Sequence, residues 1–211
     1  MDRQMSTIAP RLVIAGITNL KDAETCVSIG VDAISLIFYD DPRQLTLEKA
    51  AEICNALPPL ITLIGEFNDL PLERLKTIQR ICRLSAVRML GSENSDYVRR
   101  VNARMIRVIR LKPAGSPESE SCVTVAADVF PDFNFYYRMK NDGKRFHLWK
   151  EAASALSKYP RSMVSGKIDQ ANLAEVLKLS PYAVRINSGA ELFIGKKDPR
   201  IIEQIVKKVR S

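Results

Sequence analysis

Eight short apolar runs, separated by segments with helical patterning, are the feature that most limits what this chain can fold into. Most of the runs are almost entirely apolar, which is typical of parallel strands covered on both faces. A strand–helix alternation repeated eight times favours a closed barrel over an open doubly wound sheet. We therefore expect an α/β protein, a single (β/α)8 TIM barrel in which residues 1–211 form one domain. The expected strands are Leu12–Ile17, Ala33–Phe38, Leu60–Ile64, Ala86–Leu90, Met105–Leu111, Val123–Val129, Ser162–Val164 and Ala183–Ile186.

Start and stop signals flank several of the expected helices. Asn19 can cap the first helix, and Gly30 follows its end. Thr46 can cap the second helix in the same way. Asp198 and Pro199 are typical of an N-cap followed by proline at the first helical position, which predicts a last helix from there.

Two connections depart from the regular alternation. The fifth and sixth expected strands begin at Met105 and Val123, which leaves room for only a reduced helix after strand five. A long loop with many aromatic residues, 130–145, follows strand six before a helix near His147, which we expect to be a surface or capping residue. Active sites of such barrels lie on the loops after the strands, so this loop is a candidate lid or substrate wall. The alternative is that its aromatic residues only pack against the barrel.

The chain is basic, with 32 Lys and Arg against 24 Asp and Glu and a formal net charge of +8. A positive surface suits an anionic small-molecule ligand, and it also suits nucleic acid. The basic residues are dispersed, however, and no nucleic-acid-binding motif accompanies them. The sequence therefore favours an anionic small molecule as partner and argues against nucleic acid.

Neither a membrane nor a metal is expected as a partner. No apolar run approaches the roughly 20 residues that span a bilayer, and the N-terminus lacks the apolar stretch of a secretory signal, which favours a cytoplasmic location. The single histidine and the widely spaced cysteines do not form a zinc-binding pattern. We expect free, buried thiols and no disulfide. The cysteines are Cys26, Cys54, Cys82 and Cys122.

Several short segments resemble, in order and spacing, the phosphoribosylanthranilate isomerase family. The similarity extends from about Arg11 to Val209. The segments that carry it are Ile14–Ala23, Gly30–Ala33, Phe38–Arg43, Ala56–Pro59, Pro71–Glu73, Asn187–Glu191 and Gly195–Pro199.

The resemblance implies an Amadori rearrangement of N-(5′-phosphoribosyl)anthranilate in tryptophan biosynthesis. This reaction needs a general acid at the ring oxygen and a general base near C2, and it implies no cofactor. In the family, an aspartate ending strand six is the acid, which here corresponds to Asp128, and an arginine that meets the anthranilate carboxylate corresponds to Arg43. The ligand phosphate is expected at loops after strands seven and eight, with Arg185 adding charge. The phosphate-binding residues would be Ser165, Gly166, Lys167, Asn187, Ser188 and Gly189.

Several catalytic positions of the family are altered in this chain. Ala15 stands where the family has its basic cysteine, Leu90 replaces a histidine, and Arg185 replaces an aspartate. A methyl group cannot accept a proton, so the sequence predicts an isomerase with impaired activity. The alternative is a non-catalytic or repurposed member that binds a phosphorylated metabolite or a protein partner. The oligomeric state is left open.

Glu66 is a candidate for a relocated base. It ends the third expected strand, where the family usually has an apolar side chain. The competing interpretation is an ion pair with Arg88 or Arg185. We favour the ion pair, because charged groups at such depth usually need partners, but a catalytic role for Glu66 is retained as a hypothesis.

Overall fold

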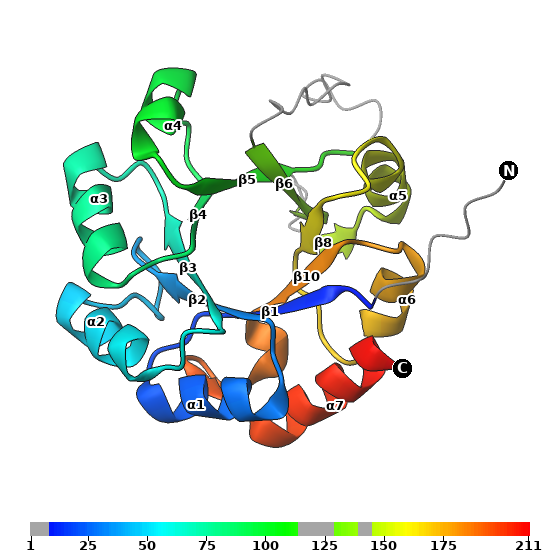
Figure 1. Cartoon of the computed structure of the whole chain (residues 1–211). Helices are drawn as coiled ribbons and strands as arrows, with labels where there is room; N and C mark the ends of the chain where they lie inside the picture. Colours follow the sequence, from blue (N-terminus) through cyan, green and yellow to red (C-terminus); the bar gives the residue numbers. More distant parts are fainter. Residues whose placement is uncertain (1–8, 114–128, 139–144) are drawn as a thin grey trace, which may run out of the picture.

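Eight parallel strands close into a barrel in the computed structural model, which describes residues 9–113, 129–138 and 145–211 (Figure 1). The strand order around the barrel is β1-β10-β9-β6-β5-β4-β3-β2, which confirms the predicted closed barrel. The barrel strands are β1 (Arg11–Ala15), β2 (Ala33–Ile37), β3 (Thr62–Phe67), β4 (Ala86–Met89), β5 (Arg104–Arg110), β6 (Val129–Asn134), β9 (Met163–Ser165) and β10 (Ala183–Ile186).

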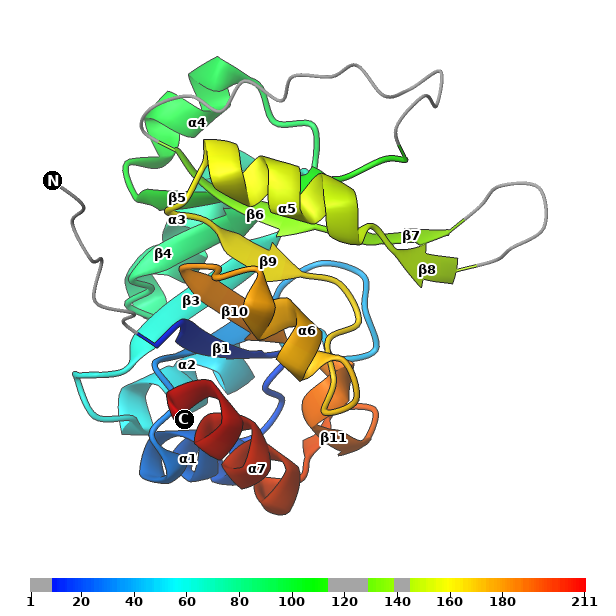
Figure 2. The same ribbon diagram turned by 90° about the vertical axis from the view of Figure 1, so that its right-hand side faces the viewer.

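Helices surround the barrel on its outside (Figures 1 and 2). The predicted caps are confirmed: the side chains of Asn19, Thr46 and Asp198 each accept a hydrogen bond from a backbone N–H of the first turn. Gly30 ends the first helix in the left-handed region, with φ of 89°. The helices are α1 (Leu20–Ile29), α2 (Leu47–Ala56), α3 (Leu72–Ile81), α4 (Ser95–Val101), α5 (Trp149–Lys158), α6 (Leu173–Lys178) and α7 (Pro199–Arg210).

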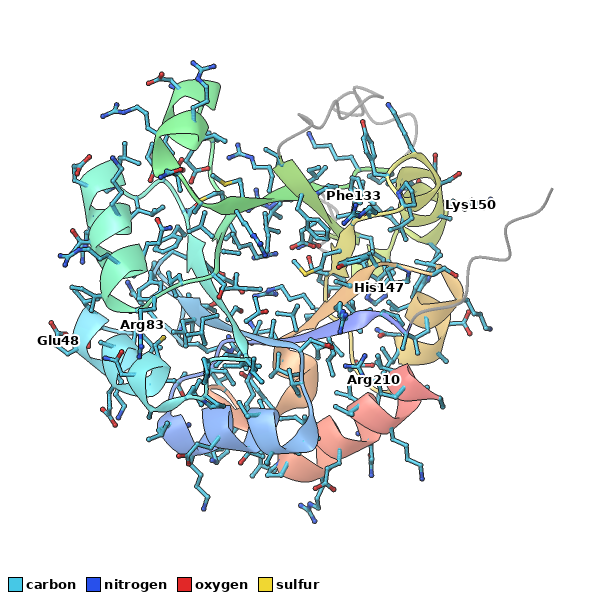
Figure 3. All side chains as sticks on the ribbon, in the orientation of Figure 1. Glu48, Arg83, Phe133, His147, Lys150 and Arg210 are labelled. Atoms are coloured by element: carbon cyan, nitrogen blue, oxygen red, sulfur yellow. The ribbon has the colours of Figure 1, made fainter. Side chains whose placement is uncertain are left out.

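The C-terminal helix is fastened to the first strand. Arg210, labelled on α7 in Figure 3, donates to the carbonyl oxygen of Pro10 at 3.1 Å and to the Asp32 carboxylate at 2.5 Å. Asp32 also accepts from the backbone N–H of Leu12 at 2.7 Å. Burial raises the pKa of Asp32, but these hydrogen bonds outweigh it and hold the pKa below its ordinary value. The Asp32 carboxylate therefore links the first barrel strand to the last helix.

The barrel interior is apolar toward one end and polar toward the other. One cluster of inward-facing residues comprises Val13, Ala33, Ile64, Ala86, Ile106, Met163 and Ala183, with Phe130 against it. Because side chains alternate along a strand, the residues two positions further on face the same interior, nearer the carboxyl ends of the strands. Those residues are Ala15, Ser35, Glu66, Arg88, Val108, Asp132, Ser165 and Arg185.

The sixth barrel strand lies further along the chain than predicted. The sequence predicts Val123–Val129, whereas β6 spans Val129–Asn134 and pairs with β5 and β9. Pro131 and Asp132 disfavour a strand in a sequence-based reading, which explains the error. The pairing of β6 with β9 begins only at Asp132, after the proline. The predicted reduced helix after strand five, and Asp128, lie outside the described residues.

The segment after β6 contains a two-stranded antiparallel sheet, β7 (Tyr136–Arg138) and β8 (Arg145–His147), which projects beyond the barrel in Figure 2. Phe135 is fully buried, and its ring centroid lies 5.0 Å from that of His147 and 5.1 Å from that of Trp149. The aromatic packing that the sequence analysis gave as the alternative is therefore present at these residues. His147 ends a strand and packs among these rings, so its prediction as a surface or capping residue is wrong.

The cysteines that the structure describes are buried and free, as expected. Burial raises the pKa of the Cys26 thiol to about 12, which makes it unreactive. Cys122 lies outside the described residues. Among the helices of the described ranges, none is both long and apolar enough to cross a membrane.

Candidate active site

Glu66 on β3 lies at the centre of a buried charge cluster. Its Oε1 accepts from Arg185 Nε at 2.8 Å and from the Ser35 hydroxyl. Its Oε2 accepts from Arg185 Nη2 at 2.8 Å and from Arg88 Nη1 at 2.9 Å. Burial raises the pKa of Glu66, but attraction to Arg185 and Arg88 outweighs it and holds the pKa below its ordinary value. The predicted ion pair is confirmed with both arginines, and Glu66 is not placed as a free base.

Arg88 on β4 joins Glu66 to a second carboxylate, Asp132 on β6. Arg88 Nε and Nη2 lie 2.7 Å and 2.5 Å from the same oxygen, Asp132 Oδ2. Burial lowers the pKa of Arg88, but attraction to Asp132 and Glu66 more than compensates and raises it above its ordinary value. The other oxygen, Asp132 Oδ1, is buried and has no hydrogen-bond partner among the described residues.

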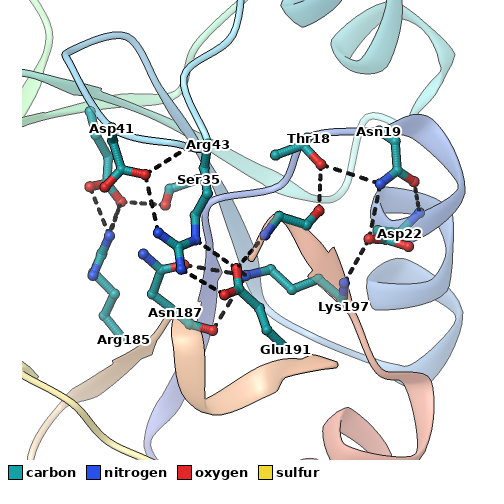
Figure 4. A network of polar contacts seen from close by, with 12 residues as sticks. Thr18, Asn19, Asp22, Ser35, Asp41, Arg43, Arg185, Asn187, Glu191 and Lys197 are labelled. Atoms are coloured by element: carbon teal, nitrogen blue, oxygen red, sulfur yellow. Dashed lines mark hydrogen bonds and ion pairs between the residues drawn. The ribbon is translucent and has the colours of Figure 1, made fainter. Parts of the chain in front are cut away.

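Arg185 reaches Glu66 across the inside of the barrel. β10 and β3 are separated by β1 and β2, whose residues in the polar layer are Ala15 and Ser35. Figure 4 shows Arg185 pointing toward Ser35. Ala15 is fully buried. The small side chains on β1 and β2 leave the space that the long Arg185 and Glu66 side chains occupy.

Ser165, on the strand next to β6, provides a second unpartnered polar group. It ends β9, the strand that pairs with β6, and Asp132 is in register with Met163. Ser165 therefore faces the interior two residues nearer the carboxyl end of the barrel. Its hydroxyl is buried without a partner among the described residues. Buried polar groups in folded proteins almost always bind something, so this pair of atoms is suited to a polar ligand group.

Arg43 follows β2 and belongs to a separate polar network (Figure 4). Its Nε and Nη2 each lie 2.7 Å from a different oxygen of Glu191, a bidentate pair, and its Nη1 lies 3.2 Å from Asp41 Oδ1. Lys197, which is buried, donates to Glu191 at 2.8 Å and to the side chain of Asn187 at 3.3 Å. Burial raises the pKa of Glu191, but its hydrogen bonds to Arg43 and Lys197 outweigh this effect and hold the pKa below its ordinary value.

The loops after β9 and β10 line an open cavity of about 460 Å³. Three of the predicted phosphate-binding residues, Lys167, Ser188 and Gly189, line it. The remaining predicted residues lie elsewhere: Ser165 is inside the barrel, Gly166 packs against Tyr136, and Asn187 binds Lys197. Arg185 is held by Glu66 instead of adding charge to this cavity. The full lining is Lys167, Ile168, Asp169, Gln170, Ala171, Ser188, Gly189 and Ile201.

Comparison with known proteins agrees with this barrel. Residues 12–208 match the family described as N-(5′phosphoribosyl)anthranilate (PRA) isomerase. The chain belongs to this family. It is 31% identical over 217 residues to the N-(5′-phosphoribosyl)anthranilate isomerase of Trichlorobacter lovleyi, covering 95% of this chain and 98% of that one.

Solved structures of phosphoribosylanthranilate isomerases have the same fold. The enzyme of Thermus thermophilus superposes with a TM-score of 0.79 at 25% identity, covering 94% of this chain and 98% of that chain. Another, in complex with reduced 1-(o-carboxyphenylamino)-1-deoxyribulose 5-phosphate, gives a TM-score of 0.75 at 24% identity, covering 95% and 98%.

The structure places an aspartate within β6 that the sequence analysis did not name as a candidate. Asp128 precedes β6, whereas Asp132 is the aspartate within β6, and its side chain is in the polar layer. The sequence reading missed Asp132 because it placed the strand too early. The signal that identifies it is the alternation in β6: Phe133 is buried among outward neighbours such as Tyr159, so its neighbour Asp132 faces inward.

His147 is a second residue whose place in the site the sequence did not predict. Its Nε2 lies 3.1 Å from the carbonyl oxygen of Gly166, in the loop after β9. In the same loop, the Lys167 ammonium lies 5.2 Å from the centre of the Tyr136 ring. The β7–β8 segment therefore contacts the loop that lines the cavity, which no local sequence pattern indicates.

Proposed function

We propose that this chain catalyses the isomerisation of N-(5′-phosphoribosyl)anthranilate to its 1-deoxyribulose phosphate isomer, as a slow member of its family in tryptophan biosynthesis. The observation that carries the proposal is Asp132, a carboxylate near the carboxyl end of β6 with one unpartnered oxygen facing the barrel interior. Catalytic groups of such barrels lie at this end of the strands. Membership of the isomerase family supplies the reaction type.

The cavity between the loops after β9 and β10 is the proposed site for the ligand phosphate. It offers the ammonium of Lys167 and the backbone around Gly189. Asp169 also lines the cavity, but its Oδ1 accepts from the N–H groups of Ala171 and Asn172, which offsets its negative charge. The solved relative that holds a deoxyribulose 5-phosphate supports a phosphorylated ligand of this class.

Arg43 remains the proposed partner for the anthranilate carboxylate. A guanidinium has five N–H donors. Three of its nitrogens bind Glu191 and Asp41, each through one bond. Two N–H groups are left for the carboxylate of a ligand.

The proposed rate is low because the polar layer lacks the usual base. Ala15 has no proton acceptor, and the nearest carboxylate, Glu66, is engaged by Arg185 and Arg88. General acid–base catalysis typically contributes ~10²–10⁴-fold. We expect turnover at least ~10²-fold below that of a relative such as the Trichlorobacter lovleyi enzyme, measured side by side by the fluorescence of the anthranilate group.

A second candidate function is a family member that binds the ligand without turning it over. The Arg185–Glu66 pair favours it, because these side chains occupy the interior next to Ala15. Binding and catalysis separate in one experiment. The protein is titrated calorimetrically with the reduced deoxyribulose phosphate analogue and assayed for turnover, and a tryptophan auxotroph lacking this isomerase is complemented with its gene.

The results of these binding, turnover and complementation experiments distinguish the two functions. Slow turnover, analogue binding and weak growth of the auxotroph support the isomerase. Tight binding without detectable turnover or growth favours the binding protein. Turnover at the rate of the relative would contradict the predicted defect, and failure to bind the analogue at millimolar concentration would contradict both functions.

We further propose that the chain works as one domain in the cytoplasm. The single closed barrel and the attachment of Arg210 to Asp32 support one folding unit. The metabolic step proposed for it supports the location.

A further inference from the structure

We propose that Asp132 is the proton-abstracting base of this site, and that its Oδ1 carries a proton from C2 to C1 of the substrate. This inference rests on the isomerase function proposed above. It assigns to the aspartate of strand six a role other than the general acid that the family resemblance implies.

The described carboxylates of the polar layer are Glu66 and Asp132, and only one of them has a free oxygen. Glu66 Oε1 accepts from Ser35 and Arg185, and its Oε2 accepts from Arg185 and Arg88. Both oxygens of Glu66 are therefore saturated by charged or hydroxyl donors. Asp132 Oδ1 has no such partner among the residues that the structure describes.

Arg88 binds only one of the two oxygens of the Asp132 carboxylate. Two of its nitrogens donate to Oδ2, at 2.7 Å and 2.5 Å, and its third nitrogen is turned to Glu66 at 2.9 Å. The contact leaves Oδ1 free while Oδ2 is fixed by two charge-assisted hydrogen bonds, which suits a proton acceptor at Oδ1. A free lone pair on Oδ1, fixed in direction by Arg88, is the geometry that a general base requires.

Ser165 is placed to orient the substrate at that oxygen. Its unpartnered hydroxyl lies on the neighbouring strand, two residues beyond the position in register with Asp132. A hydroxyl can both donate and accept, so it suits the hydroxyl group on C2 of the sugar. We assign Ser165 Oγ to the hydroxyl group on C2. We assign Asp132 Oδ1 to the hydrogen on the same carbon.

The proton transfers balance without a second acidic side chain. Water protonates the ring oxygen as its bond to C1 breaks, and the nitrogen lone pair forms the C1=N bond, leaving hydroxide. Asp132 Oδ1 takes the proton of C2, the C2–H electron pair forms C1=C2, and the C=N pair returns to nitrogen. The C2 hydroxyl then gives its proton to hydroxide as C2=O forms, and C1 takes the proton back from Asp132. Carboxylate and water are both regenerated.

The first test compares two matched substitutions. Asp132→Asn removes the base while keeping an Arg88 acceptor, and Asp96→Asn changes an exposed carboxylate of α4. We expect kcat to fall by ~10²–10⁴-fold in the first variant and to stay unchanged in the second. Affinity for the reduced analogue should change far less than kcat. Turnover that survives Asp132→Asn would overturn the inference and leave the isomerase function standing.

The second test needs no variant, so it holds even if Asp132→Asn does not fold. The unmodified protein converts substrate deuterated at C2, and NMR of the product locates the label. Because Asp132 is fully buried, exchange with solvent is slow, and we expect part of the deuterium in the C1 methylene group. Complete loss of the label to water would refute the transfer through Asp132. Absence of any turnover would overturn both this inference and the isomerase function.

Discussion

Ala15, Glu66 and Arg185 belong to the same polar layer of the barrel interior. The methyl group of Ala15 is fully buried on β1, and the pair formed by Arg185 and Glu66 crosses the interior over β1 and β2. The sequence predicts that Ala15, Glu66 and Arg185 all differ from the family pattern, and the structure joins two of these residues, Glu66 and Arg185, in one ion pair. A comparison of single positions along the sequence does not reveal this contact between Glu66 and Arg185.

Restoring the cysteine alone is therefore expected to fail. Ala15→Cys adds a thiol to a filled space, and overpacking of this kind typically costs about 1–3 kcal/mol. We expect a lower urea midpoint and turnover no higher than that of the unmodified protein. A gain of tenfold or more in kcat would show that the Arg185–Glu66 pair leaves room for a working base at position 15.

Glu66 is expected to matter for stability. Glu66→Gln leaves Arg185 with a neutral partner at this position, whereas Arg88 keeps its ion pair with Asp132. Breaking a buried pair typically costs about 3–5 kcal/mol. Glu203→Gln, on the exposed side of α7, is the control and should change stability by less than about 0.5 kcal/mol. Urea unfolding of both variants measures the difference. An equal, small effect would mean that the arginines find other partners.

Helix caps and most barrel strands could be predicted from the sequence, because residues close together in the chain determine them. Asn19, Thr46 and Asp198 cap their helices as expected, because an N-cap needs only a side-chain oxygen and the next turn. Seven of the eight predicted strands coincide with a barrel strand over at least half of their length, since buried parallel strands are apolar. β6 is the exception, because Pro131 and Asp132 are residue types that are rare in strands.

Contacts between elements are what the sequence could not supply. The pairing of Arg185 with Glu66 depends on the barrel closing, which brings together residues 119 positions apart. The contact of His147 with Gly166 depends on how β7 and β8 lie over the loop after β9. Arg43 was predicted to meet a ligand, and the structure pairs it with Glu191, a residue 148 positions away.

The two loops around the cavity are held together at a glycine. A Cβ on Gly189 would lie 2.0 Å from the backbone carbonyl oxygen of Ile168, so Gly189→Ala must push the loops after β9 and β10 apart. We expect weaker binding of inorganic phosphate by calorimetry. Gly30→Ala is the control: its Cβ meets nothing within 4 Å, but φ of 89° is strained, so it should lose stability and keep phosphate affinity. Equal phosphate affinities in both variants would place the anion site elsewhere.

Across the whole molecule, several carboxylates that fasten distant parts of the chain share one electrostatic property. Asp32 joins α7 to β1, Glu66 joins β3 to β4 and β10, and Glu191 joins Arg43 to Lys197. The folded protein holds the pKa of each of these groups below its ordinary value. Each therefore stabilises the fold when ionised, although burial opposes this in every case.

The sign of the pH dependence follows from that property. A carboxylate with a depressed pKa binds fewer protons in the folded state than in the unfolded state, so stability rises with pH in the range where the two states differ. The contribution is fully present above the ordinary pKa of 4.5 for Glu66 and Glu191 and is lost as pH falls through the folded-state values. We expect the melting temperature to be flat near neutral pH and to fall steeply below about pH 4.5. Glu191→Gln should make this fall shallower, whereas Glu203→Gln should leave it unchanged. A melting temperature that rises on acidification would contradict the assigned ion pairs.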